Sequence, residues 1–197
     1  MEKPASNKYD IHPIIKRRWS PRSFEDKPVE NEKLQRVFEA ARWAPSAFNM
    51  QPWRFIIGRK GTSSYDNIMD TLIEFNQSWT KFAPVLVLVI GKQVDAKNRP
   101  NGTFQYDTGQ SVAYLTFQAM HEGLFTHQMS GFKKSKAIEN FSIEKDHTPI
   151  AAFALGYLSA PDQLPEKLQE MERSERSRKS FEDFVFEEKF GVGSDIF

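Results

Sequence analysis

The sequence predicts a single domain of the α/β or α+β class, with helices covering both faces of a central sheet. Segments with helical periodicity alternate along the chain with short apolar runs that are rich in Val and Ile. Residues 85–90 and 150–158 are apolar at nearly every position, which is typical of strands buried on both faces. The 197 residues are enough for one domain with its own core.

Helices are predicted from the spacing of apolar residues. Between residues 30 and 43 they recur at i, i+3, i+4 and i+7, and Pro45 ends the pattern. Residues 106–122 form the longest helical pattern, and Gly123 is well placed to terminate it. The remaining predicted elements are helices at 10–18, at 66–76 and after Pro165, a strand at 53–57 and a short extended stretch at 184–186.

Composition excludes several classes of protein. The absence of cysteine removes thiol catalysis, disulfides and thiolate metal sites. The 27 basic residues nearly cancel the 26 acidic ones, so no global field attracts nucleic acid or a membrane. No secretion signal, membrane-length apolar run, dinucleotide-binding glycine motif, hydrolytic triad or metal-ligand spacing is visible. We therefore expect a cytoplasmic protein without a metal site, which binds neither nucleic acid nor a membrane.

Two segments carry basic residues at alternate positions, an arrangement that suits the binding of a phosphate group. In an extended segment Arg18, Ser20 and Arg22 point to one side, and forked guanidinium donors with a hydroxyl match the oxygens of a phosphate monoester. Arg176 and Arg178 repeat the alternation near the C-terminus. By itself the first cluster is more typical of a solvated basic turn, and the second is typical of a charged helix end.

Two further segments suit a flat heterocycle. Residues 44–53 form a turn rich in small and amide side chains, which can offer backbone N–H groups, although composition alone favours simple turn chemistry. The carboxamide of Asn76 donates and accepts hydrogen bonds at once, and it is also a natural helix C-cap.

In combination these segments strongly resemble the nitroreductase family of flavoenzymes. The motifs are Arg-x-Ser-x-Arg-x-Phe at 18–24, Ala-Pro-Ser-x-x-Asn-x-Gln-Pro-Trp at 44–53, and Arg-x-Arg-Lys at 176–179 followed by Phe-Val-Phe and Phe-Gly. Asp107-x-Gly109 and Gly123-Leu124 bound the long helix as in that family. The resemblance covers nearly the whole chain in the right order.

The resemblance implies a fold and an assembly. The expected class is α+β, a nitroreductase-like three-layer sandwich with a central mixed sheet flanked by helices. It also implies a homodimer with two FMN sites at the interface and swapped C-terminal extensions. Residues 1–197 would form one FMN-binding domain, with an extension from about 165 to 197.

The resemblance also implies a set of FMN-binding residues. Those for the phosphate and the nearby ring edge are Arg18, Trp19, Ser20, Arg22, Arg176 and Arg178. Those near the ring are Asn76 on its pyrimidine side and Ser130 and Gly131 near N5. Those in the loop that packs on the partner subunit's flavin are Pro45, Ser46 and Ala47, with Asn49 and Gln51 completing the loop.

The implied activity is ping-pong hydride transfer from NADPH or NADH through FMN to a small electron-poor acceptor, namely a nitroaromatic, a quinone or an enone. The flavin carries the chemistry, so no catalytic residue is expected. The open alternatives are another flavin reaction, such as dehalogenation or flavin fragmentation, and a non-enzymatic redox sensor. Trp19 and Trp79 depart from the family pattern, and we expect Phe48 and loop 93–103 to shape the acceptor pocket.

Overall fold

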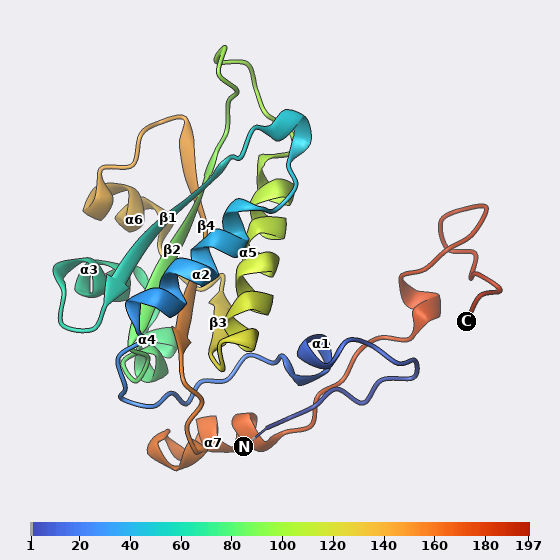
Figure 1. Cartoon of the computed structure of the whole chain (residues 1–197), viewed down its shortest axis with the longest axis horizontal. Helices are drawn as coiled ribbons and strands as arrows, with labels where there is room; N and C mark the ends of the chain where they lie inside the picture. The colour runs from blue at the N-terminus through green and yellow to red at the C-terminus, as the bar shows by residue number, and fades with distance from the viewer. Residues whose placement is uncertain (1) are drawn as a thin grey trace.

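The computed structural model describes residues 2–197 and shows a four-stranded sheet between two layers of helices (Figure 1). The strands, in sheet order, are β1 (Trp53–Arg59), β2 (Val85–Lys92), β4 (His147–Gly156) and β3 (Phe125–Met129). The helices are α1 (Pro13–Arg17), α2 (Asn31–Arg42), α3 (Ser63–Thr71), α4 (Glu74–Thr80), α5 (Phe104–His121), α6 (Lys134–Phe141) and α7 (Glu166–Arg173). Short 3₁₀ turns lie at Ala47–Asn49, Pro161–Gln163 and Phe181–Asp183.

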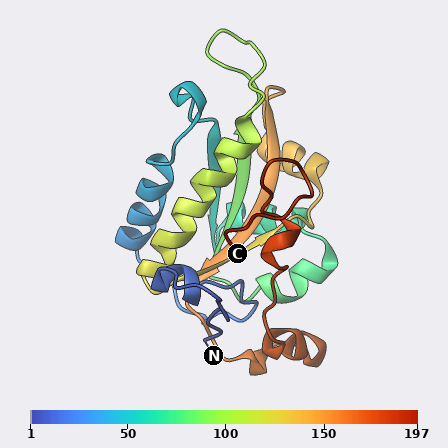
Figure 2. The ribbon, with the colours of Figure 1, turned by 90° about the vertical axis from the view of Figure 1, so that its right-hand side faces the viewer.

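The burial of strand β2 on both faces explains why residues 85–90 are all apolar. Its valines belong to a core cluster with residues of α2 and α5, whereas Leu86, Leu88 and Ile90 belong to a second cluster with residues of α3 and α6. Because successive side chains of a strand point to opposite faces, burial on both sides removes every polar position. Figure 2 shows α2 and α5 on one side of the sheet and α6 on the other. The predicted α+β class and three-layer arrangement are confirmed.

The direction of the strands differs from the prediction of a mixed sheet. Each of the three strand pairings within residues 2–197 is antiparallel. An all-apolar run reports burial on two faces and is common in parallel sheets, but it carries no information on strand direction.

The helix predicted at 66–76 is two helices, α3 and α4, separated by the extended residues Leu72 and Ile73. Leu72 forms an isolated bridge with Phe132, and the N–H of Ile73 donates to the carbonyl of Gly131 at 3.1 Å. These contacts with the chain after β3 override the helical periodicity. Asn76 consequently lies in the first turn of α4, and the C-cap role considered for it is wrong.

Strand β3 and helix α6 are absent from the prediction. In β3, polar Thr126, His127 and Gln128 interrupt the apolar pattern. In α6, Ala137 is the only buried residue. The extended stretch predicted at 184–186 contains one isolated bridge, between Phe186 and Gly193.

The C-terminal segment leaves the sheet and helices after α7. Leu168 and Glu172 anchor α7 in the body of the domain. Residues 174–197 then run beside the N-terminal segment and project away from the sheet (Figure 1). Several of their aromatic side chains are exposed, including Phe184 and Phe190. Within residues 2–197, no helix combines the length and apolarity needed to cross a membrane.

Candidate functional site

A pocket of about 230 Å³ collects residues from both ends of the chain, and we call it the basic pocket. Its lining residues are Lys3, Arg18, Trp19, Ser20, Arg22, Met171, Ser174, Glu175, Arg176 and Arg178. All six residues predicted to bind a phosphate group are among them. The structure therefore brings the N-terminal and C-terminal basic motifs together around one cavity.

The end of α1 sets the geometry of the first motif. Arg18 is the C-cap, and its extended backbone turns the chain out of the helix. Arg18 Nη1 then lies 3.4 Å from Ser20 Oγ, on the same side of the segment, as the alternation predicts. An isolated bridge between Phe24 and Leu158 holds the C-terminal end of this segment close to the end of β4.

The cations of the basic pocket repel one another. Burial lowers the pKa of the Arg18 guanidinium, and the neighbouring charges of Arg176 and Arg178 lower it further. Burial, and then the charge of Arg178, lower the pKa of Arg176 in the same direction. For Lys3, burial again lowers the pKa, although Glu172 opposes the shift. An anion in the pocket would relieve this repulsion.

Two buried donors in the pocket wall lack a hydrogen-bond partner within residues 2–197. They are Nε of Arg22 and Nε1 of Trp19. A buried donor without a partner is costly, so such groups indicate a bound acceptor or water. Donors and cations together fit the oxygens of a phosphate group.

Hydrogen bonds tie the two ends of the chain together beside this pocket. Nη1 of Arg176 donates to the carbonyl oxygens of Lys3 and Lys16, at 2.6 and 3.2 Å. Nζ of Lys3 donates to the carbonyl oxygens of Glu172 and Ser174. Arg176 thus has a structural role as well as a charge.

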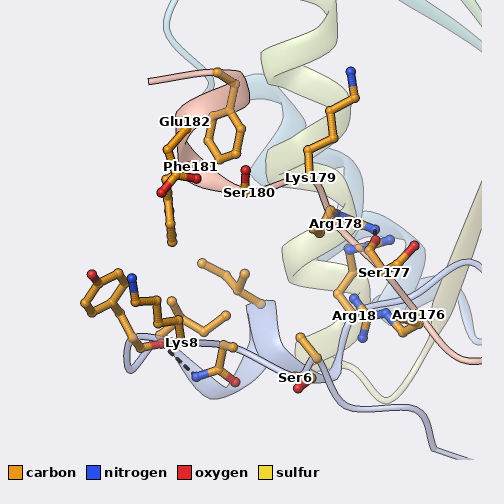
Figure 3. A pocket seen from close by; sticks show the side chains of 16 residues that line it. Ser6, Lys8, Arg18, Arg176, Ser177, Arg178, Lys179, Ser180, Phe181 and Glu182 are labelled. Carbon is orange, nitrogen blue, oxygen red and sulfur yellow. Dashed lines mark hydrogen bonds between the residues drawn. The ribbon is translucent and has the colours of Figure 1, made fainter. Parts of the chain in front are cut away.

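A larger pocket of about 570 Å³ adjoins the basic pocket. Figure 3 shows Arg18, Arg176 and Arg178 gathered at one end of it, while Lys8 and Phe181 lie at the other end. The three arginines line both pockets, so a ligand anchored in the basic pocket has space to extend.

Asn76 and Gly131 form a second predicted group. Nδ2 of Asn76 donates to the carbonyl of Gly131 at 2.9 Å, and the Asn76 residue is only 7% exposed. A Cβ atom at position 131 would lie 2.7 Å from Nδ2 of Asn76 and from Cδ1 of Ile73, so any larger residue would force these two side chains to move. Ser130, the neighbouring predicted residue, is exposed.

The loop after α2 forms a third group, at the opposite end of α5 from α1 (Figure 1). Oδ2 of buried Asp107 accepts the N–H of Ala47 at 3.2 Å, and Oγ of Ser46 accepts the N–H of Gln51 at 3.0 Å. Nε2 of Gln51 donates to Oδ1 of Asn49 at 3.0 Å. Pro45 begins this loop and is exposed. Within one chain the loop lies apart from the basic pocket.

The backbone of this loop is strained. Phe48, Asn49 and Gln51 have φ of 50°, 55° and 46°, a region that non-glycine residues seldom adopt. Clustered strain of this kind is typical of ligand-binding loops. The Phe48 side chain is 96% exposed. It therefore lines no cavity within residues 2–197, and its predicted role in an acceptor pocket stays a prediction.

Trp79 is a core residue and not part of a ligand pocket. Its side chain is fully buried, with its ring 4.4 Å from that of His127 and 6.5 Å from that of Phe24. Trp19 is also mostly buried, but it lines the basic pocket and lies under Nζ of Lys3 at 5.0 Å.

Sequence reasoning missed Lys3 and Glu172 at the basic pocket. Lys3 lies in a segment without periodicity, so no pattern indicates it. Glu172 follows Leu168 by four residues, which places a carboxylate on the apolar face of a helix. A carboxylate on an apolar helix face is unusual, and this feature could have identified Glu172 from the sequence.

Glu144, Asp146 and His147 could together offer metal ligands, since one ligand atom from each lies within 4.8 Å of the others. Nζ of Lys92 already lies 3.5 Å from the Asp146 carboxylate, and Glu144 is exposed. This group therefore already has an ion-pair partner within the described residues.

Comparison with known proteins agrees with the motifs. The model of the nitroreductase family matches residues 15–66, which include the first two motifs. A crystal structure described as an oxidoreductase containing FMN is similar with a TM-score of 0.88 and 34% identity, covering 95% of this chain and 96% of its own. A nitroreductase family protein from Clostridium difficile 630 has a TM-score of 0.70 and 25% identity, with 89% and 96% covered.

A curated relative from Bacillus subtilis (strain 168), YodC, bears the description NAD(P)H nitroreductase. It is 27% identical over 149 residues, which cover 73% of this chain and 71% of the relative. The fold, the motifs and these similarities establish that the chain belongs to the nitroreductase family, and it is by that membership an oxidoreductase.

Proposed function

We propose that this protein binds FMN with its phosphate in the basic pocket and uses NADPH or NADH to reduce a small electron-poor acceptor. The observation that carries the proposal is the convergence of Lys3, Arg18, Arg22, Arg176 and Arg178 on one cavity, together with two unpartnered donors. The description of a 34% identical structure as an FMN-containing oxidoreductase supports the same cofactor. When bound, FMN supplies reversible hydride chemistry.

The residues of the chain would bind FMN and orient it. Arg18 and Arg178 would neutralise the charge of the phosphate, and the Ser20 hydroxyl and Trp19 Nε1 would each offer it a hydrogen-bond donor. The Asn76–Gly131 contact presents a carboxamide and a close-packed backbone for the pyrimidine side and N5 edge of the ring, with Ser130 beside them. No side chain of the chain is required as a nucleophile or a proton donor.

We further propose a homodimer in which the loop from Pro45 to Gln51 completes the site of a second copy. Within one chain this loop lies at the far end of α5 from the basic pocket. The projecting C-terminal segment, with its exposed aromatic side chains, supports an exchange of arms between two copies.

The reaction is a ping-pong sequence in which reductant and acceptor occupy the same place in turn. Initial rates, measured with NADPH varied at several fixed concentrations of a nitroaromatic, a quinone or an enone, test it. Parallel double-reciprocal lines are expected with at least one acceptor. Intersecting lines would rule out ping-pong order. A flavin-bound protein that reduces none of the three would favour another flavin reaction, such as dehalogenation or flavin fragmentation, and one that also fails to oxidise NADPH and NADH would favour the redox sensor.

A further inference from the structure

The buried carboxylate of Glu172 has no place in the proposed reaction. Glu172 lies on α7 and is 2% exposed. Its Oε1 accepts the backbone N–H groups of Arg22 at 2.7 Å and Ser23 at 3.2 Å. Its Oε2 lies 3.6 Å from Nη1 of Arg22 and has no hydrogen-bond partner within residues 2–197.

These contacts act on the segment that carries the phosphate-binding side chains. Two backbone N–H groups and one guanidinium nitrogen converge on a single carboxylate, which offsets the cost of burying its charge. The carboxylate fixes the backbone at Arg22 and Ser23, and it restrains one branch of the Arg22 guanidinium. Nε of Arg22 stays in the pocket wall without a partner.

Glu172 also joins this segment to both ends of the chain. Its own carbonyl oxygen accepts a hydrogen bond from Nζ of Lys3 at 2.8 Å. The residue is the last but one of α7, immediately before the C-terminal segment that carries Arg176 and Arg178. Glu172 is therefore linked to Lys3, to the segment at Arg22 and Ser23, and to the start of the C-terminal segment, which together form the basic pocket.

We infer that Glu172 is a positioning residue that holds the basic pocket in shape for a phosphate monoester before the ligand arrives. This inference rests on the proposed function. Since Glu172 acts through Arg22 and its backbone, its effect should be confined to the phosphate end of FMN. Riboflavin, which lacks the phosphate, should bind with the same affinity whether or not Glu172 is intact.

The test compares the dissociation constants of FMN and riboflavin for the wild-type protein and for Glu172→Gln. Glutamine keeps the shape, but its amide group can turn a donor toward Arg22. We expect FMN affinity to fall about tenfold or more, as for the loss of one charge-assisted contact, and riboflavin affinity to stay constant. A purely structural role would weaken both ligands by a similar factor.

The sign of the effect is also informative. Removing a negative charge near a phosphate strengthens its binding if only through-space Coulomb forces act. A weaker FMN complex therefore reports lost positioning. Glu170→Gln is the matched control, because it makes the same chemical change on the exposed side of α7 and should leave both dissociation constants unchanged.

Each remaining outcome decides a separate claim. If wild-type protein binds FMN no better than riboflavin, the phosphate assignment and the inference both fail. If wild-type protein prefers FMN and Glu172→Gln keeps the same preference, only the positioning role is overturned. If Glu172→Gln does not fold, Glu172→Asp replaces it. That variant keeps the charge but shortens its reach, and it should reduce the FMN preference to a smaller extent.

Discussion

Arg18 and Arg178 come from opposite ends of the chain and meet in the basic pocket. Their alternation with neighbouring residues was readable from the sequence, because side chains of an extended segment alternate regardless of the tertiary fold. Their convergence was not readable from the residues alone, since it depends on how both termini pack against α7. It became an expectation only through the family motifs.

Replacing either arginine should weaken FMN binding. We expect Arg18→Ala and Arg178→Ala each to raise the dissociation constant about 10- to 100-fold, because a hydrogen bond to a charged group contributes roughly 1.5–3 kcal/mol. Fluorescence titration of apoprotein with FMN measures this. Arg17→Ala is the control, since Arg17 is exposed and pairs with Glu2 at 2.6 Å. Full FMN occupancy in both variants would remove the phosphate assignment.

A substitution at Gly131 should affect flavin binding differently from the arginine substitutions, because Gly131 lies where we propose that the flavin ring binds. The added methyl group of Gly131→Ala would meet Nδ2 of Asn76 and Cδ1 of Ile73, each at 2.7 Å, and displace the Asn76 amide. We expect FMN and riboflavin to lose affinity by the same factor, which distinguishes this variant from the arginine variants.

The control for this substitution is Gly109→Ala, where no atom lies within 4 Å of the added Cβ. It should bind both flavins normally, and it should be slightly more stable because alanine favours the helix. Equal flavin affinity in Gly131→Ala and wild-type protein would show that the Asn76–Gly131 contact does not border the flavin.

Among the elements, the long helix α5 has the clearest structural task. Its buried Asp107 holds the strained loop through the N–H of Ala47, and it also accepts a hydrogen bond from the hydroxyl of Thr103 at the start of the helix. The sequence predicted α5 well, with Gly123 at a φ of +77° after its C-terminal end. Prediction failed for β3 and α6, whose apolar patterns are short or interrupted.

Removing the Asp107 carboxylate should release the loop. We expect Asp107→Ala to lower the free energy of unfolding by about 1–3 kcal/mol, because the part-buried N–H of Ala47 and the Thr103 hydroxyl lose a charged acceptor. Urea denaturation measures the change. Gln105→Ala, on an exposed position of the same helical turn, should change the midpoint little. Unchanged stability of Asp107→Ala would show that the loop does not need this anchor.

For the whole molecule, His127 links stability to pH. Burial lowers its pKa from 6.5 to about 4, and the charge of Arg22 acts in the same direction, although the hydrogen bond with the Pro21 carbonyl opposes the shift. The unfolded chain therefore binds a proton more readily than the folded chain between these values. The contribution of His127 to the free energy of unfolding is therefore complete above pH 6.5 and is lost as the pH falls toward 4.

The size of this loss approaches roughly 3 kcal/mol, at about 1.4 kcal/mol per pH unit. Urea unfolding between pH 7.5 and 5 should show roughly 2 kcal/mol of this loss, because the folded-state pKa of about 4 is not reached at pH 5. Arg36 and Gln118 hold the pKa of Glu122 at about 2 against the opposing effect of burial. The stabilisation from Glu122 is therefore complete above its unfolded value near 4.5 and is lost only below it, so Glu122 adds no slope between pH 7.5 and 5. The variant His127→Gln should flatten the pH dependence above pH 5. An unchanged slope in that variant would assign the effect to other groups.

At this scale the fold class and its two covered faces followed from the sequence, because apolar periodicity reports burial directly. Strand direction did not follow, since both faces of β2 are buried whichever way its neighbours run. Apolar periodicity also does not predict the projecting C-terminal segment, because its aromatic residues pack on one another and on Tyr9 and the segment runs away from the sheet.

The absorption spectrum of the purified protein, recorded without oxygen before and after adding NADPH or NADH, tests the central claim most directly. The account predicts a flavin spectrum that bleaches with at least one of the two nucleotides. A protein that is colourless and cannot be reconstituted with FMN would contradict the account, and the basic pocket would then need a different anion.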